Sequence, residues 1–338
     1  MLLKKMNDMI HIRRYYGMKY LSRNIYYLFR KQNDIIYLKN NRKYSKIVNE
    51  NNNNIENASH IPVMINEVLH YLEPSPGKIF VDMTFGAGGH SMKILESSPN
   101  IKIFALDRDP IAHQYALKLS EKYPEQIIPL LGRFSELPQL LCKYKVNVNS
   151  IDGFLFDFGC SSMQLDVGER GFSLSKNGPL DMRMDGFRYP QEPTAAEVLK
   201  EITEEDLAFI LKIYGNEKYA KKIARAIIET RYTFRNLKTT QELAQLIESV
   251  IQEKRLDQLG RFTHCATKTF QALRIFVNNE LNEINYDYGK YYTLTEMKAF
   301  NRIPWKMLHK HVITPTQEEI NKNPRSRSAK LRALAKVI

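Results

Sequence analysis

The sequence has 338 residues and a net charge of +13, from 50 Lys and Arg against 37 Asp and Glu. A hydrophobic content of 43% suits a globular protein, and no run approaches the roughly 20 apolar residues that a membrane-spanning helix needs. The basic balance favours a nucleic acid as partner. Three scattered cysteines without a Cys-x-x-Cys pair argue against a disulfide framework and a Cys-rich zinc site, so we predict free thiols and no metal.

Residues 1–58 differ from the rest of the chain. They hold 12 Lys and Arg against 4 Asp and Glu, a net charge of +8, and they end with the run Asn51–Asn54. Arg-rich, acid-poor leaders are typical of mitochondrial presequences. We therefore predict a presequence or disordered leader over 1–58 and a location in the mitochondrial matrix, with a basic tail that touches RNA as the alternative.

Four short apolar runs follow the leader, and helical patterns separate the first three at Ser91–Glu96 and Ile111–Lys122. Alternating strands and helices predict a parallel sheet with right-handed crossovers, the Rossmann-like α/β class. The four predicted strands are Ile79–Asp82, Ile101–Leu106, Gln126–Leu131 and Ile151–Phe156.

From about residue 193 the pattern becomes purely helical. Apolar stripes at helical spacing run from Ala220 to Ile228 and from Phe270 to Ile284, and Thr239 with Glu242 forms a capping box. We predict a sheet domain over 59–192 and, attached to it, a helical module over 193–287.

The strongest local motif is the segment Val81–His90, in which a predicted strand enters a glycine-rich turn that opens a helix. Glycines allow the backbone to turn tightly and to approach a ligand, and the N–H groups of a helix start favour a polar or anionic group. The turn is therefore a candidate ligand-binding loop. Alone, such a turn also suits a dinucleotide or a structural bend.

The second strand ends in an acidic pair, Asp107 and Asp109. A carboxylate at this strand tip can accept both hydroxyls of a ribose, and Asp107 follows Gly88 by 19 residues, about the distance such an acid requires. An ordinary surface acid is the alternative for Asp107. Asp109 precedes a proline-initiated helix and is the better helix cap.

The third and fourth strands contribute further candidates. Phe134 can pack against an adenine ring or be a plain core residue. Asp157 ends the fourth strand and should face the same crevice, because ligands of open α/β sheets lie at the carboxyl ends of the strands. Cys160 has no identifiable base beside it, and we predict a packed residue.

Several long motifs then identify a resemblance to the MraW-type small-subunit ribosomal RNA cytosine-N4 methyltransferases, and in particular to their mitochondrial branch. The motifs follow the order of that family and cover roughly residues 60–287 and 303–335. They are His60–Val63, Thr84–Ser91, Asp157–Asp166, Glu169–Ser173, Gly178–Asp185, Tyr219–Ile227, Thr267–Val277 and Asn323–Arg332.

The resemblance implies a class I methyltransferase sheet into which the helical domain over 193–287 is inserted, with 288–338 as the truncated C-terminal part of the sheet domain. It also implies S-adenosylmethionine as cofactor and methylation of the N4 of one cytidine in mitochondrial small-subunit rRNA. The assembling mitoribosomal small subunit is then an expected partner, and the helical insertion is expected to hold RNA. The implied cofactor contacts are Gly88, Gly89, His90, Asp107, Phe134, Asp157 and Gln164.

Two roles stay open for Asp157, because its carboxylate could polarise the attacking amine or hold the cofactor's ammonium group. Lys221, Lys222 and Arg225 are candidates for phosphate contact, with a solvated helix face as the alternative for each.

The sequence departs from the family after Ile284, where the fifth parallel strand is missing and the pattern resumes only near Pro304. An incorrect gene model, a splice form or a loss of catalysis would each explain the gap. A non-catalytic RNA-binding or ribosome-assembly factor is therefore the competing hypothesis. A NAD-dependent dehydrogenase fits the glycine turn but not the segment Asp157–Asp166.

Overall fold

The computed structural model describes residues 26–30, 35–40, 62–147, 150–233, 237–253, 255–256, 262–280, 283, 305–323 and 326–336. The chain forms two compact units, each described by itself below. One comprises Leu21–Met163 and Glu283–Ile338 and holds the sheet. The other includes Gln164–Asn282 and is mainly helical.

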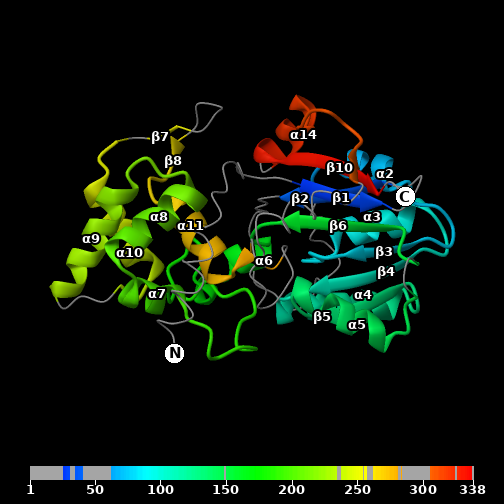
Figure 1. Ribbon diagram of the computed structural model, residues 1–338, viewed down its shortest axis with the longest axis horizontal. Coiled ribbons are helices and arrows are strands. Elements are labelled where there is room, and N and C mark those ends of the chain that lie inside the picture. The colour runs from blue at the N-terminus through cyan, green and yellow to red at the C-terminus, as the bar shows by residue number, and fades with distance from the viewer. Residues whose placement is uncertain are drawn as a thin grey trace, which may run out of the picture. The chain divides into compact units, whose positions relative to one another are not determined.

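Four parallel strands form one half of the sheet, in the order β5 (Ile127–Leu131), β4 (Lys102–Asp107), β3 (Ile79–Asp82) and β6 (Gly153–Phe158) (Figure 1). The predicted parallel sheet is thereby confirmed, with boundaries that differ by at most two residues. The crossovers contain α3 (Gly89–Ser97), α4 (Pro110–Lys122) and α5 (Leu137–Lys143), and α2 (Ile65–Leu72) precedes β3.

The period of two along each strand separates two apolar cores. Phe80, Ile103 and Leu155 share one buried cluster, which also takes in side chains of α2, α3 and α4. Val81 and Phe104 belong to the other, which is closed by residues of α5. Burial on both faces is what a parallel sheet with crossover helices requires, and it fixes the strand ends that carry the candidate site.

The other half of the sheet combines both ends of the chain. The strands β1 (Tyr26–Arg30) and β2 (Ile35–Asn40) lie between β6 and β10 (Lys330–Lys336), and each pairs with both of them. The strand β9 (Trp305–Met307) completes this edge antiparallel to β10. Leu331 and Ala333 of β10 join the core that contains Phe80.

Two segments of the expected leader are thus strands of the sheet. This arrangement differs from the expectation of a presequence or disordered leader over 1–58. Both segments contain tyrosine together with phenylalanine or isoleucine, residue types that favour strands. The remainder of 1–58 and the 285–302 junction, where the sequence is expected to lack the family's fifth strand, lie outside the described residues.

The helical unit contains α7 (Ala195–Glu201), α8 (Glu204–Gly215), α9 (Ala220–Tyr232), α10 (Thr240–Val250) and α11 (Thr267–Val277). The predicted capping box at Thr239 and Glu242 is confirmed, and Thr194 with Glu197 forms another. A short hairpin, β7 (Arg255–Leu256) and β8 (Phe262–Thr263), precedes α11.

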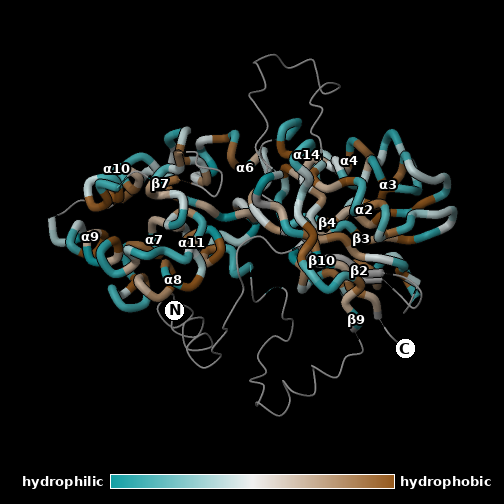
Figure 2. The backbone as a smooth tube through the Cα atoms, turned by 90° about the horizontal axis from the view of Figure 1, so that it is seen from above, coloured by the Kyte–Doolittle hydropathy of each residue, from teal (hydrophilic) through white to brown (hydrophobic). Residues whose placement is uncertain are grey.

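The helices α9 and α10 are amphipathic, as the apolar stripes predicted. Their tubes alternate between hydrophobic and hydrophilic stretches in Figure 2, and Ile223, Ile227 and Leu243 are fully buried. Within the described part of the chain, no helix combines the length and apolar character that crossing a bilayer demands.

Candidate functional site

The glycine-rich turn joins β3 to α3 and depends on left-handed backbone geometry. Gly86 and Gly88 have φ values of +55° and +78°, and the amide of Gly88 donates to the Phe85 carbonyl at 2.8 Å. A Cβ atom at Gly88 would lie 2.6 Å from the ring of Phe85. The turn therefore excludes a side chain at this position, and α3 begins directly after it at Gly89.

Asp107 lies at the tip of β4 and is hydrogen-bonded to the glycine-rich turn. Its Oδ2 accepts from the Gly86 amide at 2.8 Å and its Oδ1 from the Asp109 amide at 2.9 Å. Each carboxylate oxygen has a second lone pair that can still accept a hydroxyl. The expected placement beside the turn is confirmed, and so is the cap at Asp109, which accepts from the Ile111 amide at 3.0 Å.

Asp82, the last residue of β3, is a site residue that the motif analysis missed. It is 2% exposed, and its carboxylate accepts from the Ser91 hydroxyl at 2.7 Å and the Thr84 amide at 3.1 Å. Burial, with the nearby charges of Asp157 and Asp107, raises the pKa of Asp82 to about 7. An acid at the end of a buried strand, immediately before a glycine-rich turn, was the available signal.

Burial also raises the pKa of Asp107 to about 6, with the Asp109 charge adding to the effect. The two neighbouring strand ends therefore hold two carboxyl groups whose hydrogen bonds only partly offset the cost of ionisation in a buried site. A ligand with hydroxyl donors and positive charge would stabilise both ionised forms. The donor and acceptor chemistry of the site fits such a ligand.

Asp157 lies near the end of β6, the strand that pairs with β3. Its backbone amide donates to the hydroxyl of Thr84, which ties β6 to the glycine-rich turn. Its carboxylate faces His90 of α3, with 3.7 Å between Oδ2 and the ring Nδ1. The carboxyl ends of β3, β4 and β6 thus gather three acids and one histidine around the turn, as the fold class predicted.

The remaining sequence candidates lie in different surroundings. Phe134 begins a short 3₁₀ helix after β5, half-buried, and its ring lies edge-on to Phe156 and Phe158 at centroid distances of 5.7 and 5.8 Å. Gln164 is buried in α6 (Ser162–Asp166), at the point where the chain passes into the helical unit. Cys160 is a buried thiol, as expected of a packed residue.

The three cations proposed for phosphate contact lie on α9 and differ in their surroundings. Lys221 is exposed. Lys222 donates to the Val250 carbonyl at 2.8 Å, and Arg225 lies 3.5 Å from a carboxylate oxygen of Glu204. Lys222 and Arg225 thus each already have a partner within the helical unit, which a phosphate contact would share or replace.

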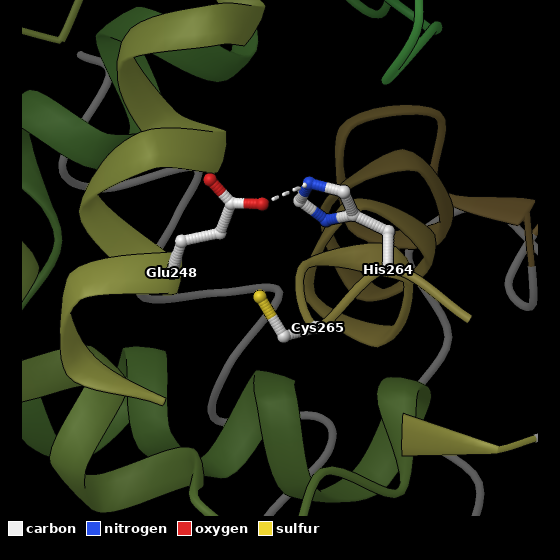
Figure 3. Close-up of side chains that lie close together, drawn as sticks. All are labelled: Glu248, His264 and Cys265. Atoms are coloured by element: carbon white, nitrogen blue, oxygen red, sulfur yellow. Dashed lines mark ion pairs between the residues drawn. The ribbon is translucent and has the colours of Figure 1, made fainter. Parts of the chain in front are cut away.

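A separate cluster joins the end of α10 to the start of α11. The ligand atoms of Glu248, His264 and Cys265 lie within 4.8 Å of one another (Figure 3). The Ala266 amide donates to Nδ1 of His264 at 3.1 Å, so the ring proton lies on Nε2, which donates to Glu248 at 2.9 Å. With Nε2 so occupied, and the pKa of the Cys265 thiol raised by burial, we interpret the cluster as a hydrogen-bonded link between helices.

Comparison with known proteins agrees with this geometry. Residues 57–297 match the MraW methylase family. The probable methyltransferase-like protein 15 homolog of Drosophila melanogaster is 44% identical, with 83% of this chain and 94% of the relative covered. The 12S rRNA N(4)-cytidine methyltransferase METTL15 of Mus musculus is 45% identical, with 82% of each chain covered.

A third relative, the putative receptor-type tyrosine-protein phosphatase mosPTP-1 of Culex quinquefasciatus, is 50% identical over 83% of this chain. The chain spans only 22% of the length of that relative, so a name given to the whole of it carries no argument here. The family match extends over more than half of the chain, and two relatives above 30% identity are covered over most of their length. The chain belongs to the MraW methylase family.

Proposed function

We propose that this protein transfers a methyl group from S-adenosylmethionine to the N4 of a cytidine in mitochondrial small-subunit rRNA. The observation that carries the proposal is the position of Asp157, on the strand next to the glycine-rich turn and in ion-pair range of His90. The printed name of the mouse relative, a 12S rRNA N(4)-cytidine methyltransferase, supports the same substrate.

The proposed cofactor contacts follow from the acceptors and the turn. Asp107 accepts the ribose hydroxyls, the backbone of Gly88, Gly89 and His90 borders the amino-acid part, and Phe134 and Gln164 complete the set. Bound S-adenosylmethionine supplies an electrophilic methyl group on a positively charged sulfur. The ionised forms of Asp82 and Asp107, which burial disfavours, would be stabilised by that charge.

Asp157 is the proposed catalytic residue. A cytosine amine is a poor nucleophile because its lone pair is delocalised into the ring, so a hydrogen-bond acceptor on the amine raises its reactivity. The Asp157 side chain is 19% exposed, which leaves its carboxylate within reach of a base. The cytidine must be unstacked from its neighbours before it can reach this strand end.

For the RNA we propose a phosphate contact at Lys221, with Lys222 and Arg225 joining when their present partners are exchanged. The partner is the rRNA within the assembling mitoribosomal small subunit, and the location is the mitochondrial matrix. The basic, acid-poor composition of residues 1–58 and the 12S rRNA in the name of the mouse relative support this location. Removal of one phosphate contact should reduce the slope of log affinity against log salt concentration by about 1.

The decisive experiment mixes the full chain with labelled S-adenosylmethionine and 12S rRNA and locates the methyl group by nucleoside analysis. Methyl on a cytidine N4 is expected, with transfer lost in Asp157→Asn and cofactor affinity lost in Asp107→Ala. Glu121→Gln, an exposed carboxylate on α4, is the matched control and should behave as the unmodified chain does.

The second candidate is a non-catalytic RNA-binding or assembly factor, which the departure from the family after Ile284 favours. It predicts rRNA binding without methyl transfer by the folded chain. That outcome, with intact cofactor-independent RNA affinity, would replace the enzymatic proposal.

A further inference from the structure

The hydrogen bond of His90 determines which of its ring nitrogens is basic. Nε2 lies 3.0 Å from the carbonyl oxygen of Val63, which can only accept, so Nε2 carries the proton. The basic position of the neutral ring is therefore Nδ1, and this atom is the one that faces Asp157, 3.7 Å from Oδ2. The Nδ1 lone pair of His90 and the ionised Asp157 carboxylate repel each other, so the two groups attract only when they share a proton.

The carbonyl that sets this tautomer is itself held in place. Val63 is completely buried. Met64, the next residue, has a left-handed φ of +54° and donates its amide to Oε1 of Glu319 at 2.6 Å. Glu319 lies on α14 (Gln317–Lys322), so a contact between distant parts of the chain fixes the partner of His90.

We infer that His90 is a positioning residue that acts through Asp157 and relays the proton released from the cytidine amine. The inference rests on the proposed function and adds a second residue to its mechanism. His90 is 8% exposed, and its side chain is less exposed than that of Asp157, at 10% against 19%, which suits a relay and not a group that touches the base.

The proton balance of the step is complete. A bond forms between N4 and the methyl carbon as the bond from that carbon to sulfur breaks, and the sulfur retains the electron pair. The amine then loses one proton to Oδ2 of Asp157, and the proton passes to Nδ1 of His90. Return of the proton through Asp157, the more exposed of the two side chains, to solvent restores the neutral ring, whose Nε2–H donates to the Val63 carbonyl throughout.

The charged groups around the pair favour a shared proton. Asp82 on β3 lies close enough to Asp157 for their charges to interact, and Asp107 on β4 interacts with Asp82. Ser91, next to His90 on α3, donates to Asp82. With acids on all three neighbouring strands, protonation of His90 offsets negative charge. The distance of 3.7 Å is longer than a hydrogen bond, which is common in ligand-free sites.

His90→Gln and His90→Asn separate a relay from a structural role. A glutamine amide can still donate to the Val63 carbonyl but has no basic nitrogen, whereas the shorter asparagine loses that hydrogen bond as well. A relay predicts that both variants lower kcat by about 100-fold, the lower end of what proton transfer contributes. A structural role predicts normal transfer in the glutamine variant. His70→Gln, exposed on α2, is the matched control.

The pH profile supplies a readout that a structural role would not move. Transfer by the unmodified chain should rise with pH as the pair loses its shared proton. In His90→Gln that rise should move to lower pH, because Asp157 alone then stays ionised further into the acid range. Parallel profiles for the two proteins would overturn the inference. Thermal unfolding and cofactor titration of each variant identify any loss that comes from misfolding.

A measurement without turnover distinguishes this inference from the proposed function. Nitrogen NMR of the histidine rings, with His90 assigned by its absence in His90→Gln, should show the Nε2–H tautomer and a titration that Asp157→Asn moves to lower pH. An Nδ1–H tautomer would overturn the pair even in an active enzyme. Absence of transfer by the unmodified chain would instead reject the proposed function and the relay together.

Discussion

Gly88 combines a left-handed backbone with a close neighbour, and the two effects can be measured apart. Gly77, in the turn before β3, has a similar φ of +81° with open space where a Cβ would lie. Gly77→Ala should cost about 1 kcal/mol from backbone strain alone. Gly88→Ala should cost more, because its Cβ would meet the Phe85 ring at 2.6 Å, and it should also weaken cofactor binding. Chemical denaturation measures the stability of the two variants, and cofactor titration measures the affinity of Gly88→Ala. Equal losses of stability in the two variants would show that the Phe85 ring moves aside.

Asp82 makes stability depend on pH. Its pKa of about 7 in the folded chain exceeds that of an exposed aspartate, so the folded state binds the proton more tightly. Its contribution is complete below about pH 4 and is lost as pH rises through 7. Between pH 5 and 8 the loss should be about 3 kcal/mol, at about 1.4 kcal/mol per pKa unit. In Asp82→Asn, the free energy of unfolding measured by denaturant titration should fall less between pH 5 and 8. An equal fall in the variant and the unmodified chain would contradict the assignment of this pH dependence to Asp82.

The residues that could be predicted are those whose neighbours are close in sequence. Asp107 and Asp109 follow from a strand end and a helix start. Asp82 was missed because only the fold shows how completely its carboxylate is buried, although its position before the glycine-rich turn was a local signal. The contact of His90 with Val63 spans 27 residues and needs the folded α2–α3 arrangement, so no local pattern could reveal it.

At the scale of elements, a buried ion pair connects the start of α9 with the hairpin β7–β8. Glu217 is fully buried and makes two hydrogen bonds to Arg255, at 2.6 and 2.7 Å. Burial opposes ionisation, but these bonds hold the pKa of Glu217 below its usual range. Its contribution is therefore present at neutral pH and lost as pH falls through that lowered pKa.

Arg255→Ala should destabilise the chain by about 3 kcal/mol, because it leaves an uncompensated buried carboxylate. The exposed pair of Lys218 and Glu253 provides the control, and Lys218→Ala should cause no measurable loss. Denaturation at pH 7 compares the two. If Arg255→Ala also caused no loss of stability, water would have to hydrate the Glu217 carboxylate in the variant.

The predicted and unpredicted elements differ in how much of their signal is local. The strands β3 to β6 are short apolar runs separated by segments with helical periodicity. The capping boxes of α7 and α10 each depend on residues within a span of four. The strands β1 and β2 lie in a basic segment whose charge resembles a leader. Their pairing partners lie in β6 and β10, and sequence patterns do not specify such distant partners.

At the scale of the whole molecule, removal of residues 1–58 would take away both strands that lie between β6 and β10. The edges of β6 and β10 would lose these partners, and unpaired edges favour aggregation. We expect a chain that begins at Ser59 to unfold at a lower temperature and to bind more hydrophobic dye than the full chain. A chain that begins at Leu21, which keeps both strands, is the control. Equal unfolding temperatures for all three would show that β1 and β2 contribute nothing.

The pairing of the two chain ends also affects the order in which this protein is made. Tyr26 pairs with Leu331, a separation of 331 − 26 = 305 residues, whereas β3 to β6 lie within one continuous stretch. During synthesis the parallel strands β3 to β6 can assemble, and β1 and β2 can pair with β6, while their other partner β10 has not yet been made. A nascent chain would therefore carry β1 and β2 with one of their two partners missing until β10 emerges, and chaperones that hold extended segments are the factors on which its yield should depend.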